Sequence, residues 1–583
     1  MNSPRGVLWI TIALQVVITL AIFGLSWRFE FYSEGINRPI RPVMALLILQ
    51  FGLQLSSLFL VLKQAPSRSI AFTVFGIALL LRCILLFSTP IQEVDIYRYM
   101  WDGIVSTEGI SPFCYAPLEV AQAGDTRGDG KLTRLQQVAE SNPGIRETLN
   151  RVHFPELPTV YPPSSQFVFA LASWTTPTDA SIEVRLAVMK FAILLFDLGV
   201  VALLWRLLLL RSMHPGWTMA YAWSPLVLKE FANSGHLDAI AVFLTVATLL
   251  WLHTRSCSRL RALPVFVSAV LAGLAVGAKI YPILLFPLIA VYLFRMRGVR
   301  LAALWSSVAI LATALVLTPM FAGALSFGGV SETQETADPH SAVQTTDAAQ
   351  LAGSEVEVLD LAAPKADRTG SLSGLSTFLT RWEMNDLLFM VVEENLRPDG
   401  SVAGQPDLWF VVLPNSLRGA LVRRFAYVTG QSGERSPFLM TRMLTLAIFA
   451  GIGGWLCFVV WKMPDRLLEA CFLCLAWFWL LAPTQNPWYW TWALCLVPFA
   501  RTQLWQAVGG LTLLYYWRFW FLYHPTPAGN LGTDYQGVEF FDFGVTWLEF
   551  GPFLFVLLFC GLKRCLTSQK QRKLRKKLVS PVS

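Results

Sequence analysis

The chain has 583 residues, of which 55% are hydrophobic and only 14% are charged, and its mean hydropathy is +0.52. This composition excludes an ordinary soluble globular protein and predicts an all-α polytopic membrane protein, because many uncharged runs are long enough to cross a bilayer. The net charge of +8 does not indicate nucleic acid as a partner, since Lys and Arg lie between apolar runs, as the positive-inside rule predicts.

The N-terminal region, residues 1–89, holds three apolar runs that we expect to be transmembrane helices: 7–27, 43–62 and 70–87. Lys63 and Arg68 lie between the second and third runs and mark the cytoplasmic side. The N-terminus is therefore expected in the cytoplasm, and the stretch after Phe87 outside.

Residues 90–183 are polar and too long for a bare connector, so we expect a first extracytoplasmic loop with juxtamembrane helices. It opens with EVDIYRYMWDGIVSTEGISPFCYAP at 93–117. If this run is helical, Asp95, Tyr99 and Asp102 fall at i, i+4 and i+7, and both carboxylates share one face as candidate bases. Residues 161–174 are apolar but too short to span, which favours an interfacial or re-entrant helix.

The rest of the chain divides by composition. Residues 184–320 form a core bundle with expected spans at 184–210, 217–228, 237–251, 263–276, 281–294 and 301–320. A large extracytoplasmic loop, 321–437, follows; its first part has the composition of a mobile segment, and 375–395 that of an amphipathic surface helix. Residues 438–563 carry spans at 438–460, 467–481, 488–499, 504–521 and 545–562, before a basic cytoplasmic tail, 564–583. The total is about 14 spans, with both termini in the cytoplasm.

Polar groups collect at span junctions on the expected outer side. They are His236 and Asp238 in KEFANSGHLDAI, Lys279 and Tyr281 in GAKIYP, and Asn486, Trp488 and Tyr489 in PTQNPWYW. Ionisable groups at membrane depth are costly and usually functional. Each cluster also has a plain structural interpretation: an aromatic belt, a lysine that snorkels to the headgroups, a helix-capping pair, or a solvated juxtamembrane helix for Asp95 and Asp102. Asp197, within a span, is expected to be a structural hydrogen-bonding partner.

Five motifs in order resemble a known superfamily. They are D-x-Y-R-Y-x-W-D-G with G-I-S-P-F-x-Y-A-P, then YPP at 161–163, SPLVLKEFANSGHLDA, GAKIYP and NPWYWTW. Together they resemble the GT-C superfamily, integral-membrane glycosyltransferases that use polyprenyl-phosphate sugars. The likeness is closest to the bacterial polyprenol-phosphomannose-dependent α-mannosyltransferase families. Ser224 and Leu237 stand where those families usually have Asn, which leaves the donor sugar open.

The resemblance implies a GT-C-like fold and transfer of a hexose, with mannose expected, from a polyprenyl monophosphate to an extracytoplasmic glycan or glycolipid, with inversion. It implies Asp95 as general base and Asp102 as the group that orients the acceptor or Arg98. Lys279 and His236 are candidates for the donor phosphate, with Arg381 or Arg518 as further cations. The full set expected to bind donor or acceptor is Arg98, Tyr99, Trp101, Tyr161, His236, Asp238, Lys279, Tyr281, Arg381, Asn486, Trp488 and Tyr489.

No cofactor or metal is expected, because Lys and Arg can meet a monophosphate leaving group and no ligand cluster demands an ion. The expected partners are membrane lipid, the lipid-linked donor and the acceptor, at a bacterial plasma membrane with the site facing out. Two other classes stay open: a lipid-linked-sugar flippase or transporter, and a non-catalytic assembly subunit. A transporter should show repeated halves and charges in mid-span, and no repeat is visible. A subunit would not need the loop with two carboxylates.

Overall fold

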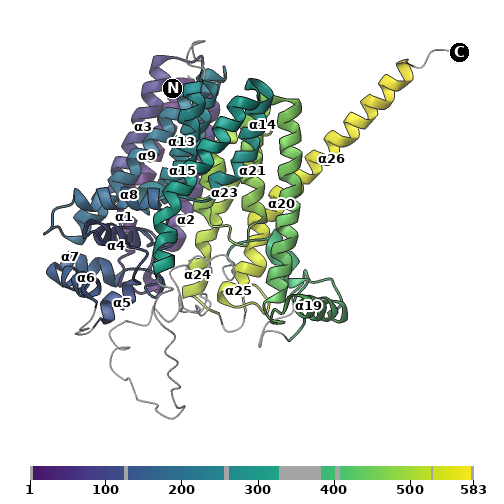
Figure 1. Ribbon diagram of the computed structural model, residues 1–583. Coiled ribbons are helices and arrows are strands. Elements are labelled where there is room, and N and C mark those ends of the chain that lie inside the picture. Colours follow the sequence, from purple (N-terminus) through teal and green to yellow (C-terminus); the bar gives the residue numbers. More distant parts are fainter. Residues whose placement is uncertain are drawn as a thin grey trace.

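The computed structural model describes residues 4–123, 129–254, 262–326, 383–400, 408–526 and 529–579. Within these ranges the chain is helical, without strands and with one isolated bridge, between Met384 and Thr484. Long helices stand side by side in an upright bundle, and shorter helices gather at its lower end (Figure 1). The expected all-α fold is confirmed.

The N-terminal half runs from α1 (Pro4–Ser26) to α15 (Val299–Ser326). Between them lie α2 (Ile40–Leu62), α3 (Arg68–Leu86), α4 (Ile96–Thr107), α5 (Pro117–Gln122), α6 (Gly130–Ser141), α7 (Pro143–Asn150), α8 (Pro163–Trp174), α9 (Ile182–Leu210), α10 (Met219–Ala222), α11 (Pro225–Val227), α12 (Asp238–His253), α13 (Ala262–Ala278) and α14 (Phe286–Arg297). A π-helix, Leu228–Asn233, separates α11 from α12.

The C-terminal half comprises α18 (Leu388–Glu394), α19 (Asn415–Thr429), α20 (Ser436–Lys462), α21 (Leu467–Leu481), α22 (Pro487–Leu494), α23 (Trp505–Leu511), α24 (Trp517–Tyr523), α25 (Gly537–Phe540) and α26 (Thr546–Val579). The amphipathic helix expected over 375–395 is seen only as α18, because residues up to 382 lie outside the described ranges.

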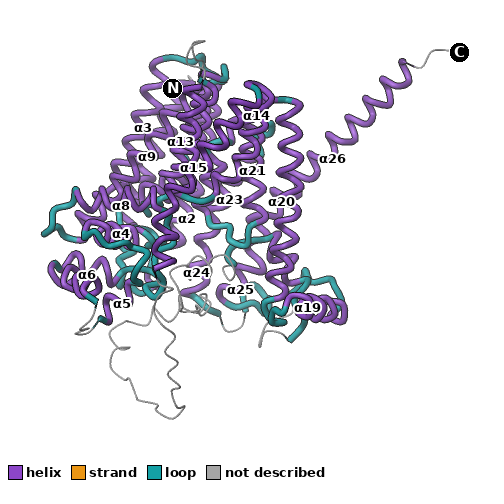
Figure 2. The backbone as a smooth tube through the Cα atoms, in the orientation of Figure 1, coloured by secondary structure: helices purple, strands orange, loops and turns teal. Residues whose placement is uncertain are grey.

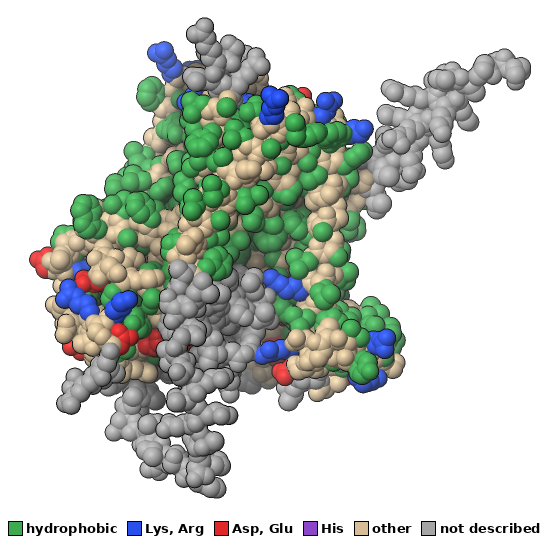
Figure 3. Space-filling view, viewed as in Figure 1, with side chains coloured by type: hydrophobic (Ala, Val, Ile, Leu, Met, Phe, Trp, Pro, Cys, Tyr) green, Lys and Arg blue, Asp and Glu red, His purple; other side chains and the backbone are tan. Residues whose placement is uncertain are grey.

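Seven described helical stretches are long and apolar enough to cross a membrane: α1, α2, α3, α9, Val299–Phe321 of α15, α20 and Gly537–Gly561. An eighth would be Pro225–Asn233 with Asp238–His253, two helices bent by 120° at a short break. Hydrophobic side chains cover the middle of the face drawn in Figure 3, while charged side chains lie at its two ends. The protein is therefore membrane-embedded, and the count of about 14 spans remains a prediction.

Several expected spans are interrupted, among them 217–228 and 488–499. The run 217–228 forms the short helices α10 and α11, and 488–499 ends α22 at Leu494 before a separate turn, Val497–Phe499. Pro225 and Pro498 lie at these breaks, and proline lacks the N–H that a continuing helix needs. Apolar composition alone does not reveal such breaks, because each piece is as hydrophobic as a true span.

A buried ion pair fixes the centre of the bundle. Nε of Arg82 in α3 lies 2.6 Å from Oδ2 of Asp197 in α9, and the hydroxyl of Tyr221 donates to Oδ1 at 2.8 Å. Both charged side chains are almost fully enclosed, so each oxygen of the carboxylate needs these donors. Asp197 is thus structural, as the sequence predicted.

Residues 90–183, the expected first extracytoplasmic loop, fold into α4 to α8, and α8 covers the apolar run that was predicted to be interfacial. Loops gather at this end of the bundle (Figure 2). A small second core holds the loop helices together: Trp101, Ile104, Val105, Leu135, Ile145 and Leu149 are among its members. Gly103 permits the close crossing of α4 and α8, since a Cβ there would lie 2.4 Å from the carbonyl oxygen of Phe169.

Candidate functional site

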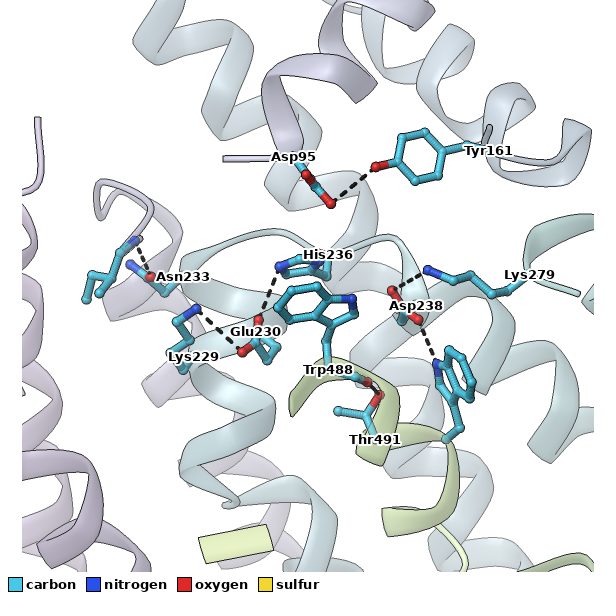
Figure 4. A network of polar contacts seen from close by, with 12 residues as sticks. Asp95, Tyr161, Lys229, Glu230, Asn233, His236, Asp238, Lys279, Trp488 and Thr491 are labelled. Carbon is cyan, nitrogen blue, oxygen red and sulfur yellow. Dashed lines mark hydrogen bonds and ion pairs between the residues drawn. The ribbon is translucent and has the colours of Figure 1, made fainter. Parts of the chain in front are cut away.

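Asp95 lies at the start of α4, at the N-cap position, with its side chain partly exposed. The hydroxyl of Tyr161 donates to its Oδ2 at 3.2 Å (Figure 4). Tyr161 comes from the YPP motif just before α8, and its ring packs edge-on against Tyr99 at 4.9 Å. Helix packing in the outer loop therefore aims Tyr161 at the candidate base.

Asp102 lies on the same helix but in a different setting. Its side chain is 2% exposed, and its Oδ2 accepts from Thr159 at 2.5 Å and from Gln166 at 2.9 Å. Burial raises the pKa of this carboxyl, while Arg98 and the two hydrogen bonds oppose the rise. These contacts favour a structural role for Asp102 over the expected contact with an acceptor.

Three more predicted residues of α4 have structural partners. The guanidinium of Arg98 donates to the carbonyls of His153, Phe154 and Leu157 at 2.6–3.2 Å, which braces the loop before Tyr161. Tyr99 is buried and stacks on Phe169 at 4.7 Å. Trp101 is buried in the small core of the loop. They build the wall behind Asp95 and are not exposed to a ligand.

A second part of the site is built on the π-helix. Glu230 is fully buried, with Nζ of Lys229 3.4 Å from its Oε1 and Nε2 of His236 3.2 Å from its Oε2 (Figure 4). The ring of His236 stacks on Trp488 at 4.4 Å. π-Helical turns are frequent at functional sites. His236 and Trp488 were predicted, whereas Lys229 and Glu230 were not; the signal for the pair was two charges directly after the apolar run 217–228.

The third part lies at the start of α12 and the end of α13. Asp238 is fully buried and accepts from Nε1 of Trp492 at 2.6 Å and from Nζ of Lys279 at 3.3 Å. Lys279 is 19% exposed in its side chain, and its ammonium lies 4.9 Å from the centre of the Tyr489 ring. Lys279 is therefore held by one carboxylate and one aromatic face, while part of it stays accessible.

Aromatic rings fix this third part. Tyr281 stacks on Trp492 at 4.2 Å, and its hydroxyl lies 3.4 Å from that of Thr245. Tyr489 stacks on the other side of the same indole at 4.5 Å. Trp492, which the sequence analysis missed as a site residue, thus joins the GAKIYP and NPWYWTW motifs.

The three parts form one cluster. Asp95 is close enough to Asp238 and Tyr489 to interact with both electrostatically. Gly235, with φ of +69°, packs so closely on Ile96 that a Cβ would lie 2.4 Å from its side chain. The turn that presents His236 therefore rests directly on the residue after Asp95, and only glycine tolerates both the dihedral and the contact.

Two buried residues hold the segment that leads to Asp95. Asn233 donates to Ser88 and Thr89 and accepts from the backbone N–H of Ile91 at 2.9 Å. Lys190 in α9, fully buried, donates to the carbonyl of Ser88 at 2.5 Å. An ammonium at the C-terminal end of a helix satisfies carbonyls that have no partner within that helix.

The end of the segment 321–437 also reaches the site. Met384 pairs with the 483–485 segment through two backbone hydrogen bonds, of 2.9 and 3.0 Å, just before Asn486. Asn486 is 2% exposed and stands at the N-cap position of α22, without a capping hydrogen bond from its side chain. The sulfur of Met384 accepts from the hydroxyl of Tyr515 at 3.2 Å. The loop segment after 382 is thus part of the wall of the site.

The remaining predicted cations differ in their placement. Arg518 is partly buried and ion-paired with Asp542 at 3.2 Å, so one neighbour already neutralises it. Arg381 lies outside the described residues. Among the residues the structure describes, no group of three or more His, Cys, Asp or Glu could hold a metal ion.

Glu93, two residues before Asp95, was not predicted. Burial raises its pKa to about 7, with a further rise from Asp95, while Lys229 and a hydrogen bond from Tyr515 oppose it. The side chain as a whole is partly exposed, but its Oε1 is enclosed. A carboxyl of this kind can exchange a proton near neutral pH.

The cluster thus combines a partly exposed carboxylate, a partly exposed ammonium and stacked aromatic rings on one surface. Carboxylates can accept protons, ammonium groups can stabilise a phosphate, and aromatic faces can pack against apolar or sugar surfaces. Comparison of the chain with protein-family models, with curated proteins and with solved structures found no match.

Proposed function

We propose that this chain is a GT-C-type membrane glycosyltransferase, which transfers a hexose, with mannose as the expected sugar, from a polyprenyl monophosphate to a glycan or glycolipid. The observation that carries the proposal is that Asp95 lies near enough to the Lys279–Asp238 pair, from distant parts of the chain, to act on Asp238 electrostatically. Glycosyl transfer from a lipid phosphate needs a proton acceptor beside a group that stabilises the departing phosphate. Both lie on one surface here.

In the proposed reaction, the acceptor hydroxyl attacks the anomeric carbon from the face opposite the phosphate, which inverts the configuration. Asp95 takes the hydroxyl proton as the new C–O bond forms and the bond from carbon to phosphate oxygen breaks. Tyr161 donates to Oδ2 of Asp95, which leaves Oδ1 for the acceptor. The ammonium of Lys279 has three N–H groups, of which one is directed at Asp238, so two can meet oxygens of the leaving phosphate. No further cofactor is required in this scheme.

We further propose about 14 spans and an extracytoplasmic site in a bacterial plasma membrane. Lys and Arg dominate the upper end of the bundle in Figure 3, while the end with α4 and α19 carries both signs of charge. This asymmetry supports a cytoplasmic upper end. In a cysteine-free background, Ser432→Cys should react with an impermeant thiol reagent added from outside, and Ser212→Cys should not. The opposite pattern would refute the orientation.

The enzyme assay uses purified protein in lipid with labelled polyprenyl-phosphate mannose, and with other hexoses as alternatives. Transfer or hydrolysis of the sugar that disappears in Asp95→Asn is expected. Movement of intact donor between leaflets without bond cleavage would refute the transferase and support a flippase. Absence of both with every donor would support a non-catalytic subunit.

A further inference from the structure

The hydroxyl of Tyr515 connects two segments that both end at the candidate site. Tyr515 is 2% exposed, its ring packs edge-on against that of Trp488 with centroids 6.3 Å apart, and its hydroxyl donates to Sδ of Met384 at 3.2 Å. The same hydroxyl lies within hydrogen-bonding reach of Glu93, two residues before Asp95. One buried hydroxyl therefore faces two acceptors, a carboxyl on the segment before α4 and a thioether on the segment before α18.

The start of the 383–395 segment is tied to the wall of the site by hydrogen bonds, not by a helix or a sheet. The N–H of Met384 donates to the carbonyl of Pro483 at 2.9 Å, and its carbonyl accepts from Gln485 at 3.0 Å. The side chain of Asn385 donates to the carbonyl of Gln485 at 3.2 Å. A stretch held in this way can open locally while the helical bundle stays folded, so the loss of one hydrogen bond changes the opening measurably.

The single proton of the Tyr515 hydroxyl can be donated to Met384 or to Glu93, but not to both. A protonated Glu93 can donate its own proton to the Tyr515 oxygen, which leaves the tyrosine proton for Met384. An ionised Glu93 can only accept, and a carboxylate is a much stronger acceptor than a thioether. It therefore takes the tyrosine proton, and Met384 loses this donor.

The surroundings of Glu93 allow it to change charge near neutral pH. Burial is the main reason why its pKa is raised to about 7. The titratable and charged groups that face it come from the segment before α4, the π-helix and the turn that leads into α24: Asp95, Lys229, Glu230, Tyr515 and Arg518.

The 383–395 segment also has ionisable groups of its own. Glu383 faces Glu393, and Arg397 pairs with Glu393 at 2.5 Å and with Glu394 at 3.1 Å. Burial raises the pKa of Glu393 to about 7 as well. A test of Glu93 must therefore separate its ionisation from that of Glu393.

We propose that Glu93 and Tyr515 form a proton-controlled switch for the 383–395 segment: with Glu93 neutral the start of the segment is tied to the wall of the site, and with Glu93 ionised it is released. The segment is therefore held more firmly at low pH and opens more often as the pH rises through 7. The switch sets how often this wall opens. It concerns the docking of one segment and stands whether or not the protein transfers sugar.

The test is hydrogen exchange of the full chain in lipid nanodiscs at pH 6 and pH 8. The reporters are the amides of Met384 and Gln485, and an unstructured peptide of the same sequence corrects for the intrinsic effect of pH on exchange. We expect the equilibrium constant for local opening to rise roughly 3- to 10-fold from pH 6 to pH 8, the size of one modest hydrogen bond.

Two variants should each remove most of this rise, at opposite levels of opening. Glu93→Gln stays neutral and keeps an NH₂ donor for the Tyr515 oxygen, so opening should remain low at both pH values. Tyr515→Phe keeps the ring beside Trp488 but has no proton to donate, so opening should be high at both. A merely structural role would loosen the segment in both variants.

Glu393→Gln is the matched control, because it removes a carboxyl that ionises in the same pH range from the segment itself. It should keep the rise that Glu93→Gln abolishes. An unchanged pH dependence in Glu93→Gln or in Tyr515→Phe would overturn the proposal, and so would its absence in the unmodified chain. If Glu93→Gln does not fold, Tyr515→Phe decides. Because no sugar donor is used, these outcomes are independent of whether glycosyl transfer is later observed.

Discussion

Two aspartates lie on the same face of α4, Asp95 at its N-cap and Asp102 in its middle, and their surroundings are opposite. Asp95 is partly exposed and has a single side-chain hydrogen bond, from Tyr161. Asp102 is enclosed, with Thr159 and Gln166 both donating to one oxygen. A carboxylate with an accessible oxygen can take a proton from a substrate, whereas an enclosed one stabilises the fold. Sharing a helix face therefore does not give two residues the same role.

The partners of the two aspartates also come from different distances along the chain. Asp102 meets residues of its own outer loop. Asp95 lies where four segments meet, since His236, Lys279 and Tyr489 all belong to the cluster around it. Neighbouring segments of the chain thus supply the partners of Asp102, whereas the surroundings of Asp95 depend on how the whole bundle packs.

Asp95→Asn is the most direct test of the difference between the two aspartates, because it keeps the shape of the side chain and removes the proton acceptor. Loss of a general base should lower turnover by roughly 10²- to 10⁴-fold. The unfolding temperature should hardly change, because Asp95 is partly exposed. Turnover of labelled lipid-linked sugar and a thermal melt of the same sample measure both. Near-normal turnover would assign the base elsewhere.

Lys279→Ala should have the next largest effect. A charge-assisted hydrogen bond to phosphate contributes about 1.5–3 kcal/mol, so use of the donor should weaken by roughly one to two orders of magnitude. Lys279→Arg should recover part of the loss, because it keeps the charge but changes the geometry. A lysine that only snorkels to the headgroups would leave the dependence of turnover on donor concentration unchanged.

Asp102→Asn tests the structural role of Asp102 with the same chemical change as Asp95→Asn. The amide oxygen can still accept from Thr159 and Gln166, but the charge that strengthens both hydrogen bonds is lost and an NH₂ group replaces the second oxygen, which should lower the free energy of unfolding by roughly 1–3 kcal/mol. Turnover per folded molecule should stay close to that of the unmodified protein. A large loss of turnover with unchanged stability would reverse the roles of the two aspartates.

Tyr161→Phe removes the one side-chain hydrogen bond to Asp95 and keeps the ring contacts with Tyr99. We expect a reduction of turnover by roughly 3- to 10-fold, the size of a single modest hydrogen bond. Tyr99→Phe is a matched control, since Tyr99 is stacked in the wall behind Asp95. Equal losses in both variants would mean that the rings, and not the hydroxyl of Tyr161, matter.

The smallest expected effect concerns Glu93 and stability. Its pKa is about 7 in the folded chain and near 4.5 when unfolded, mainly because burial disfavours the charged form. The folded state therefore binds the extra proton, and this contribution to stability is complete below about pH 4.5 and is lost as the pH rises through 7. Glu93→Gln cannot ionise, so its unfolding temperature should fall less between pH 5 and pH 8. Equal falls would contradict the assignment.

The sequence by itself determined the class of fold and the candidate surface. Long apolar runs with few charges are strong evidence for spans, and seven of them are helices of sufficient length. Asp95, Tyr161, His236, Asp238, Lys279 and Trp488 were all predicted, because polar residues at the ends of apolar runs are conspicuous. Arg98, Tyr99 and Trp101 were predicted equally well by type and spacing, yet they are structural.

Only the tertiary structure separated the residues of the candidate site from the structural ones. The exposure and the contacts of each side chain depend on distant segments, whose position the sequence does not give. Glu230 and Lys229 were missed because a charged pair directly after a predicted span, 217–228, looks like an ordinary span end, whereas the π-helix buries both in the cluster. Asp95 and Asp102 have the same residue type and the same helix face, yet Asp95 stays partly exposed beside Tyr161, whereas Thr159 and Gln166, from α8 and the loop before it, enclose Asp102.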